Sequence, residues 1–153
     1  MPAFPTGTDS QYVESRPRSL LVLTDVRGGR HDGFDRVVMQ FRGPGKPGWY
    51  TAYVRRPRAD GSGERVPVAG DSFLDVYASG TTYDPDEPAY DYDTRRHVAV
   101  PGDGPVRDVY VLGTFEGNTQ VLVGIEGAAR PYRVFRLADP PRLVVDVRDT
   151  AGG

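Results

Sequence analysis

Short runs of hydrophobic residues recur along most of this chain, and several of them alternate with polar residues. Within residues 34–42, large apolar side chains stand at every second position, Val37, Met39 and Phe41. A period of two indicates a β-strand with one buried face. Runs of this kind predict strands over residues 19–26, 34–42, 49–56, 72–78, 107–115, 119–126, 132–137 and 143–148.

Turn-forming residues separate these runs. The chain contains 19 glycines and 14 prolines, and the pair Gly117 and Asn118 stands between two runs where a hairpin is expected. No stretch shows the period of an amphipathic helix. The pattern therefore predicts an all-β, antiparallel protein of roughly eight or nine strands, arranged as a sandwich or a barrel.

The 153 residues have the length of one average domain. Residues 1–18 show no periodicity and are predicted to form a flexible leader, residues 19–149 the folded domain, and residues 150–153 a short tail. Residues 80–96 break the strand rhythm with three tyrosines, five carboxylates and two prolines. A loop of this length is either functional or simply solvated.

Charge and hydropathy exclude two classes of partner. Lys and Arg number 19 against 21 Asp and Glu, so the formal net charge is −2 and no basic field is available for nucleic acid. The mean hydropathy is −0.48, and no apolar run reaches the ~20 residues that a membrane-spanning helix requires. Nucleic-acid binding and membrane insertion are therefore not expected. The sequence has no cysteine, which excludes disulfides and thiolate metal sites.

The sequence carries no recognisable catalytic motif. His31 and His97 are its only histidines, and neither has a metal-ligand partner at the usual spacings. The nucleophile elbow, the phosphate loop, the zinc-protease helix and the dinucleotide-binding turn are all missing. We therefore predict a protein that is not an enzyme and uses no cofactor and no metal. A hydrolase assembled from residues distant in sequence is the weakest alternative.

Two acidic segments allow both a structural and a cation-binding interpretation. Asp32 and Asp35 could hold a cation with His31, or Asp32 could form a tight turn while Asp35 pairs with an arginine. The carboxylates of residues 80–96 could bind Ca²⁺ or remain solvated. The structural interpretation is favoured in both segments, because calcium loops need more oxygen donors than the first segment offers and surface carboxylates need no partner.

One predicted strand carries a candidate binding surface. Trp49, Thr51, Tyr53 and Arg55 alternate along the run 49–56 and therefore share one face. Aromatic rings stack on the C–H faces of sugars, and arginine donates to hydroxyl or carboxylate oxygens. Trp49, Tyr53 and Arg55 are thus the candidate ligand-binding residues of a glycan-binding strip.

Two arginines of the preceding strand extend this hypothesis. Arg36 and Arg42 would lie beside the strip if the two strands pair antiparallel. The alternative interpretation places Trp49 and Tyr53 in the hydrophobic core, either with the opposite face of their strand in solvent or with both faces packed in a sandwich.

Three stretches together resemble the AMIN-like domain found in many secreted proteins and lipoproteins of actinobacteria. They read LLVLTDVRGGRHDGFDRVVMQFRG (20–43), ADGSGERVPVAGDSFLDVY (59–77) and FEGNTQVLVGIEGAARPYRVFRLADPPRLVVDVR (115–148). The closing PPRLVVDVR is similar to the final strand motif of the AMIN domain proper, a targeting module attached to cell-wall amidases and secretion-pore proteins. The resemblance implies a β-sandwich of two packed sheets, a non-catalytic role, and peptidoglycan as ligand.

Two functions from different classes follow. The first is a non-catalytic cell-envelope binding module that recognises peptidoglycan or a related wall glycan. The second is a protein–protein interaction or scaffold domain that recruits a cell-wall enzyme or another envelope partner. The resemblance implies an envelope or extracellular location. The sequence itself shows no signal peptide and no lipobox cysteine, so a cytoplasmic location stays an alternative.

Overall fold

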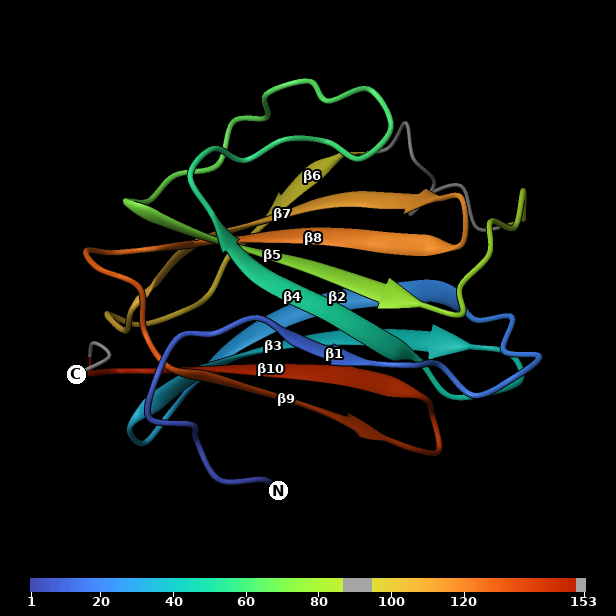
Figure 1. Cartoon of the computed structure of the whole chain (residues 1–153), viewed down its shortest axis with the longest axis horizontal. Helices are drawn as coiled ribbons and strands as arrows, with labels where there is room; N and C mark the ends of the chain where they lie inside the picture. Colours follow the sequence, from blue (N-terminus) through green and yellow to red (C-terminus); the bar gives the residue numbers. More distant parts are fainter. Residues whose placement is uncertain (87–94, 151–153) are drawn as a thin grey trace.

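The computed structural model describes residues 1–86 and 95–150, and in these residues the chain folds into two antiparallel sheets (Figure 1). The six-stranded sheet has the order β1 (Gln11–Val13), β4 (Gly48–Val54), β5 (Ser72–Ser79), β8 (Asn118–Ile125), β7 (Val106–Phe115) and β6 (Arg96–Val98). The four-stranded sheet has the order β2 (Val22–His31), β3 (Phe34–Arg42), β10 (Arg142–Arg148) and β9 (Tyr132–Leu137). The predicted all-β sandwich of two packed sheets is confirmed.

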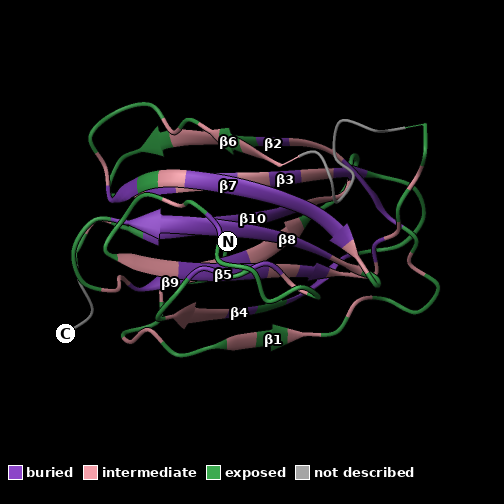
Figure 2. Cartoon of the chain, turned by 90° about the horizontal axis from the view of Figure 1, so that it is seen from above, coloured by how far each residue is buried: buried purple, intermediate pink, exposed green. Residues whose placement is uncertain are grey.

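The inward faces of the two sheets form the main hydrophobic core. The alternation predicted in β3 is confirmed, because Val37, Met39 and Phe41 are at most 1% exposed. They belong to one cluster with Leu74 and Val123 of the other sheet. Figure 2 shows that the buried residues concentrate in the central strands, β7, β8 and β10 among them. Full burial of an aliphatic side chain stabilises the fold by about 1.5–3 kcal/mol, so this cluster holds the two sheets together.

The N-terminal segment contributes a strand that the sequence did not predict. Tyr12 lies opposite Tyr50 in an antiparallel pairing of β1 with β4. No strand was predicted before residue 19, and β1 lies within the segment that was expected to form a flexible leader. A strand of three residues is too short to show a period, and the free edge of β4 supplies its hydrogen-bonding partners.

The first residues of the chain lie against the outer face of the four-stranded sheet. The ring of Phe4 packs edge-on against Phe34 with 5.9 Å between centroids, and the guanidinium of Arg133 lies 4.2 Å from the Phe4 ring centroid. Arg133 also donates from Nη1 to the carbonyl of Pro2 at 3.1 Å. The segment before β2 is thus attached to both sheets.

The connection between β4 and β5 covers part of the outer face of the six-stranded sheet. It contributes Ala59 and Val66 to a second, smaller core, whose other members are Tyr110, Leu112 and Leu122 of β7 and β8. None of the described residues forms a helix long and apolar enough to cross a membrane. The connection leaves Tyr12 of β1 and Tyr50 of β4, on the same outer face, exposed to solvent.

Candidate functional site

The aromatic residues of the predicted strip face the interior. Trp49 is 8% exposed and belongs to the main core. The Tyr53 hydroxyl donates to the carbonyl of Arg130 at 2.6 Å, and its ring packs edge-on against Tyr132 with 5.8 Å between centroids. Burial raises the pKa of Tyr53 to about 12. These two rings therefore lie where the core interpretation placed them. Arg55 lies in solvent just beyond the end of β4.

The two arginines of β3 do not lie beside this strip. β3 pairs with β2 and β10, whereas β4 pairs with β1 and β5. The condition that would place Arg36 and Arg42 beside the strip, an antiparallel pairing of β3 with β4, is therefore not met. The turn after β3 carries the chain from one sheet to the other. Such a crossover lets the two sheets bury their hydrophobic faces against each other. Arg42 forms an ion pair with Asp84. The five candidate residues are thus distributed over two sheets.

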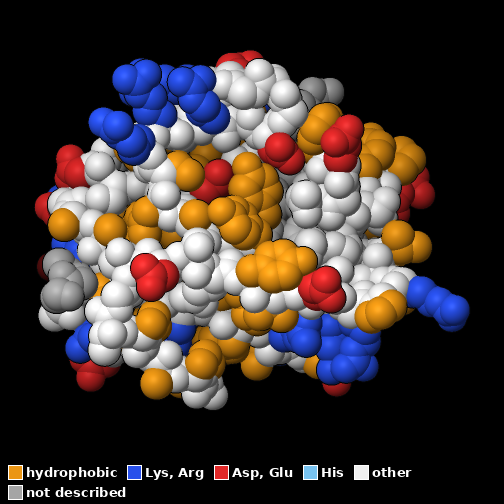
Figure 3. All heavy atoms as spheres, viewed as in Figure 1, with side chains coloured by type: hydrophobic (Ala, Val, Ile, Leu, Met, Phe, Trp, Pro, Cys, Tyr) orange, Lys and Arg blue, Asp and Glu red, His pale blue; other side chains and the backbone are white. Residues whose placement is uncertain are grey.

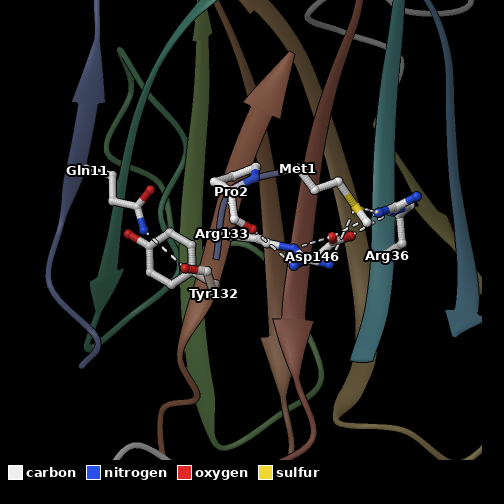
Figure 4. Close-up of polar contacts among 7 residues, drawn as sticks. All are labelled: Met1, Pro2, Gln11, Arg36, Tyr132, Arg133 and Asp146. Carbon is white, nitrogen blue, oxygen red and sulfur yellow. Dashed lines mark hydrogen bonds and ion pairs between the residues drawn. The ribbon is translucent and has the colours of Figure 1, made fainter. Parts of the chain in front are cut away.

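Arg36 belongs to a charged cluster on the four-stranded sheet (Figure 4). The carboxylate of Asp146 is completely buried. It accepts hydrogen bonds from Arg36 Nε and Nη2 at 2.7 and 2.9 Å, and from Arg133 Nε at 2.8 Å. Hydrogen bonding to this carboxylate raises the pKa of Arg36. Both cations are held by one anion beneath Met1 and Pro2, so we assign this cluster to stability.

Asp35 takes the structural role that the sequence allowed for it. Its carboxylate is 1% exposed and accepts hydrogen bonds from Arg30 Nη1 at 3.2 Å and from the amide of Val106 at 3.0 Å. Within residues 1–86 and 95–150 no three His, Asp or Glu side chains are grouped so that they could hold a metal ion. Residues 87–94 of the acidic segment lie outside the described residues, so for them the favoured interpretation as solvated carboxylates stays a prediction.

The opposite face of β4 carries the exposed aromatic surface. Tyr12 of β1, Tyr50 of β4 and Tyr77 of β5 are direct cross-strand neighbours, and we call these three residues the tyrosine row. Tyr12 is 66% and Tyr50 47% exposed, and the rings of Tyr50 and Tyr77 are 6.4 Å apart between centroids. Figure 3 shows hydrophobic side chains gathered over β5, β4 and β1 near the middle of the view.

A shallow hollow of about 380 Å³ accompanies the tyrosine row. Its lining combines the aromatic rings with carboxylate, hydroxyl and amide groups, and it consists of Tyr12, Trp49, Tyr50, Asp60, Tyr77, Ser79 and Asn118. Flat rings beside a few polar groups are typical of sites that bind small, amphipathic ligands such as sugars.

A buried polar network supports the row from one side. Gln120 donates from Nε2 to Asp75 Oδ1 at 3.0 Å and to the Tyr77 hydroxyl at 3.2 Å. Its Oε1 accepts from the amide of Asp60 at 2.8 Å. Burial raises the pKa of Asp75 to about 6, and the charge of Asp60 acts in the same direction, while hydrogen bonds from Gln120 and Tyr77 oppose it. The network fixes Tyr77 and positions Asp60 at the rim of the hollow.

The binding strip considered in the sequence analysis lies on the other face of the same strand, β4. The alternation separates Tyr50 from Trp49 and Tyr53, so the periodicity already places Tyr50 on the opposite face. Which face is buried depends on the strand order, and Tyr12 and Tyr77 join Tyr50 only through that order. The one available signal was that Tyr50 and Tyr77 each lie in a predicted strand.

The molecule is a sandwich of two antiparallel sheets that carries the tyrosine row on one outer face. A family model, the AMIN-like domain, matches residues 21–149. The chain therefore belongs to the AMIN-like domain family, whose members are generally non-catalytic binding or targeting modules associated with the cell wall and envelope. No match was found among curated proteins or among solved structures.

Proposed function

We propose that this chain is a non-catalytic module that binds peptidoglycan or a related wall glycan through the tyrosine row. The observation that supports this most is the alignment of Tyr12, Tyr50 and Tyr77 across three neighbouring strands, next to a hollow lined by polar groups. Family membership supplies the cell-wall context.

The row has the dimensions and the chemistry of a platform for a linear glycan. Neighbouring strands lie ~4.8 Å apart, so three aligned residues span about 10 Å, which exceeds one sugar ring. The exposed ring faces of Tyr12 and Tyr50 can stack on sugar C–H groups. The side chains of Asp60, Ser79 and Asn118 can exchange hydrogen bonds with hydroxyl and acetamido groups.

Replacing Tyr12 and Tyr50 together by alanine should weaken binding to purified, protein-free sacculi by roughly tenfold or more. Each aromatic contact contributes about 0.5–1.5 kcal/mol beyond the area it buries, and both side chains are exposed, so the fold does not depend on them. Co-sedimentation at low and high salt measures the effect, because stacking resists salt whereas ion pairing does not.

Two matched variants accompany this test. Tyr83→Ala removes a tyrosine that is 51% exposed and does not line the hollow, and it should leave binding unchanged. Tyr50→Phe keeps the ring and should retain most of the affinity. If the double alanine variant sediments with sacculi as well as the parent protein does, the tyrosine row is not the binding surface. If the parent protein does not sediment at either salt concentration but forms one crosslinked complex in lysate, the interaction-domain alternative replaces the glycan proposal.

A further inference from the structure

Four exposed arginines lie close together in sequence on the connection between β4 and β5. Arg55, Arg56, Arg58 and Arg65 are all exposed, and we call them the arginine patch. Figure 3 shows basic side chains gathered over this connection at the upper left of the view. The whole chain has a net charge of −2, so the patch is a local exception to the charge of the molecule.

The backbone beneath the patch is held in a hairpin-like shape. The amide of Ala59 donates to the carbonyl of Glu64 at 2.8 Å, and the amide of Val66 donates to the carbonyl of Pro57 at 3.1 Å. Pro57, Ala59 and Val66 are buried against the sheet. Since side chains alternate along an extended chain, the arginines that flank these residues project outward.

Gln120 fastens this connection to the centre of the six-stranded sheet. Its Nε2 donates to the carbonyl of Arg58 at 2.8 Å, and its Oε1 accepts from the amide of Asp60 at 2.8 Å. The side chain of Gln120 is 2% exposed. The arginines are therefore displayed on a fixed surface, and binding to them costs little loop entropy.

The charges of the patch are not neutralised within the described part of the chain. Arg58 and Arg65 lie directly opposite each other in an antiparallel bridge, where like charges destabilise the pairing. The neighbouring carboxylate of Glu64 pairs with Arg95 at 2.9 Å. Arg58 donates to the carbonyl of Gly63, and the side chains of Arg55, Arg56 and Arg65 have no partner among residues 1–86 and 95–150.

Several arginines elsewhere in the molecule are paired with carboxylates. Arg27, Arg30, Arg36 and Arg107 each have a carboxylate partner within hydrogen-bond distance. Two like charges that face each other on a rigid surface without an anion between them destabilise the fold locally. Such exceptions are expected where a surface serves binding.

We propose that the arginine patch binds an extended polyanion through its phosphate groups, on a surface separate from the tyrosine row. The planar guanidinium presents donors in a fork that fits phosphate oxygens, and an anion between Arg58 and Arg65 would relieve their repulsion. Several cations within one connection suit a polymer with repeated charges better than a single small anion. Residues 55–67 include no exposed large hydrophobic side chain that could insert into a lipid surface.

Long-chain inorganic polyphosphate is the probe, and binding is measured by titration of the full chain at about 50 mM and about 200 mM salt. The double variant Arg56→Gln with Arg65→Gln should bind about twenty-five-fold more weakly at the lower salt, from a loss of about fivefold for each arginine near an anionic surface. The affinity of the parent protein should fall steeply between the two salt concentrations.

The matched control removes the same charge elsewhere. Arg16→Gln with Arg18→Gln changes two exposed arginines before β2, and it should leave polyphosphate binding unchanged. Thermal unfolding of both double variants establishes that each one folds. The Tyr12 and Tyr50 alanine variant should also keep its polyphosphate affinity, so a failure of the glycan proposal and a failure of this one are distinguishable.

Three results would overturn the proposal. The first is an equal loss of affinity in the two arginine double variants, which would mean that only net charge matters. The second is no measurable binding of polyphosphate by the parent protein at the lower salt. The third is binding to phosphatidylglycerol vesicles without binding to polyphosphate, which would make the partner a lipid surface.

Discussion

Replacing Asp146 by alanine is expected to lower the free energy of unfolding by about 3–5 kcal/mol. The carboxylate is completely buried and is the common acceptor of Arg36 and Arg133. Without it, two guanidinium groups stay side by side in a partly buried position with no anion between them. Breaking a buried ion pair by removing one partner costs far more than the pair itself contributes, because the remaining charge stays desolvated. Chemical denaturation measures the loss.

An exposed pair provides the comparison for this result. Asp25 accepts from Arg27 at 2.8 Å, with side chains 43% and 46% exposed, and Asp25→Ala should cost at most about 1 kcal/mol. Asp146→Asn keeps the shape of the side chain and removes only its charge. Its loss of unfolding free energy should therefore lie between the losses for Asp146→Ala and Asp25→Ala. Similar losses for Asp146→Ala and Asp25→Ala would contradict the role given to the buried cluster.

Replacing Asp75 by asparagine should stabilise the protein at pH 7 by about 2 kcal/mol. It should also abolish a decrease in the free energy of unfolding that the parent protein shows as the pH rises from about 4 to about 6. The pKa of Asp75 is raised to about 6 by burial, whereas an aspartate in an unfolded chain titrates near pH 4. Between pH ~4 and ~6 the folded state therefore binds more protons than the unfolded state. The free energy of unfolding of the parent protein should fall as the pH rises through this window and level off above it.

The asparagine variant keeps the acceptor that Gln120 uses and removes only the titration. Urea unfolding of both proteins between pH 4 and pH 7 shows the effect as two curves that converge at the acidic end. Asp60→Asn is the second variant, because the charge of Asp60 contributes to the raised pKa of Asp75, and it should move the window toward lower pH. A parent curve that is flat or rises over this range would show that Asp75 is ionised throughout.

The strands with clear periodicity could be predicted from the sequence, and the short ones could not. β3 alternates over nine residues because one face lies in the core and the other is only partly buried. β1 and β6 have three residues each, so they carry too few positions for a period. They form the two edges of the six-stranded sheet because β4 and β7 provide hydrogen-bonding partners from distant parts of the chain.

The candidate site was harder to predict because it depends on strand order. Tyr12, Tyr50 and Tyr77 are separated by up to 65 positions in sequence and become neighbours through the pairings of β1 with β4 and of β4 with β5. The same strand order separates Arg36 from Arg55. From the sequence alone, these two arginines could have lain on one surface. The sequence suggested aromatic rings beside an arginine on one face of β4, whereas the hollow on its other face combines tyrosines with Asp60, Ser79 and Asn118.

The position of β1 has a consequence for any shorter version of this protein. The family match begins at residue 21, after Gln11–Val13, so a fragment cut at that boundary would leave the backbone amides and carbonyls of β4 without β1. An uncovered strand of seven residues is a template for addition of a strand from another molecule. We expect such a fragment to self-associate through β4, which light scattering would detect as an increase in mass with concentration. The N-terminal strand thus protects the edge of β4 from pairing with other molecules, and it also places Tyr12 beside Tyr50.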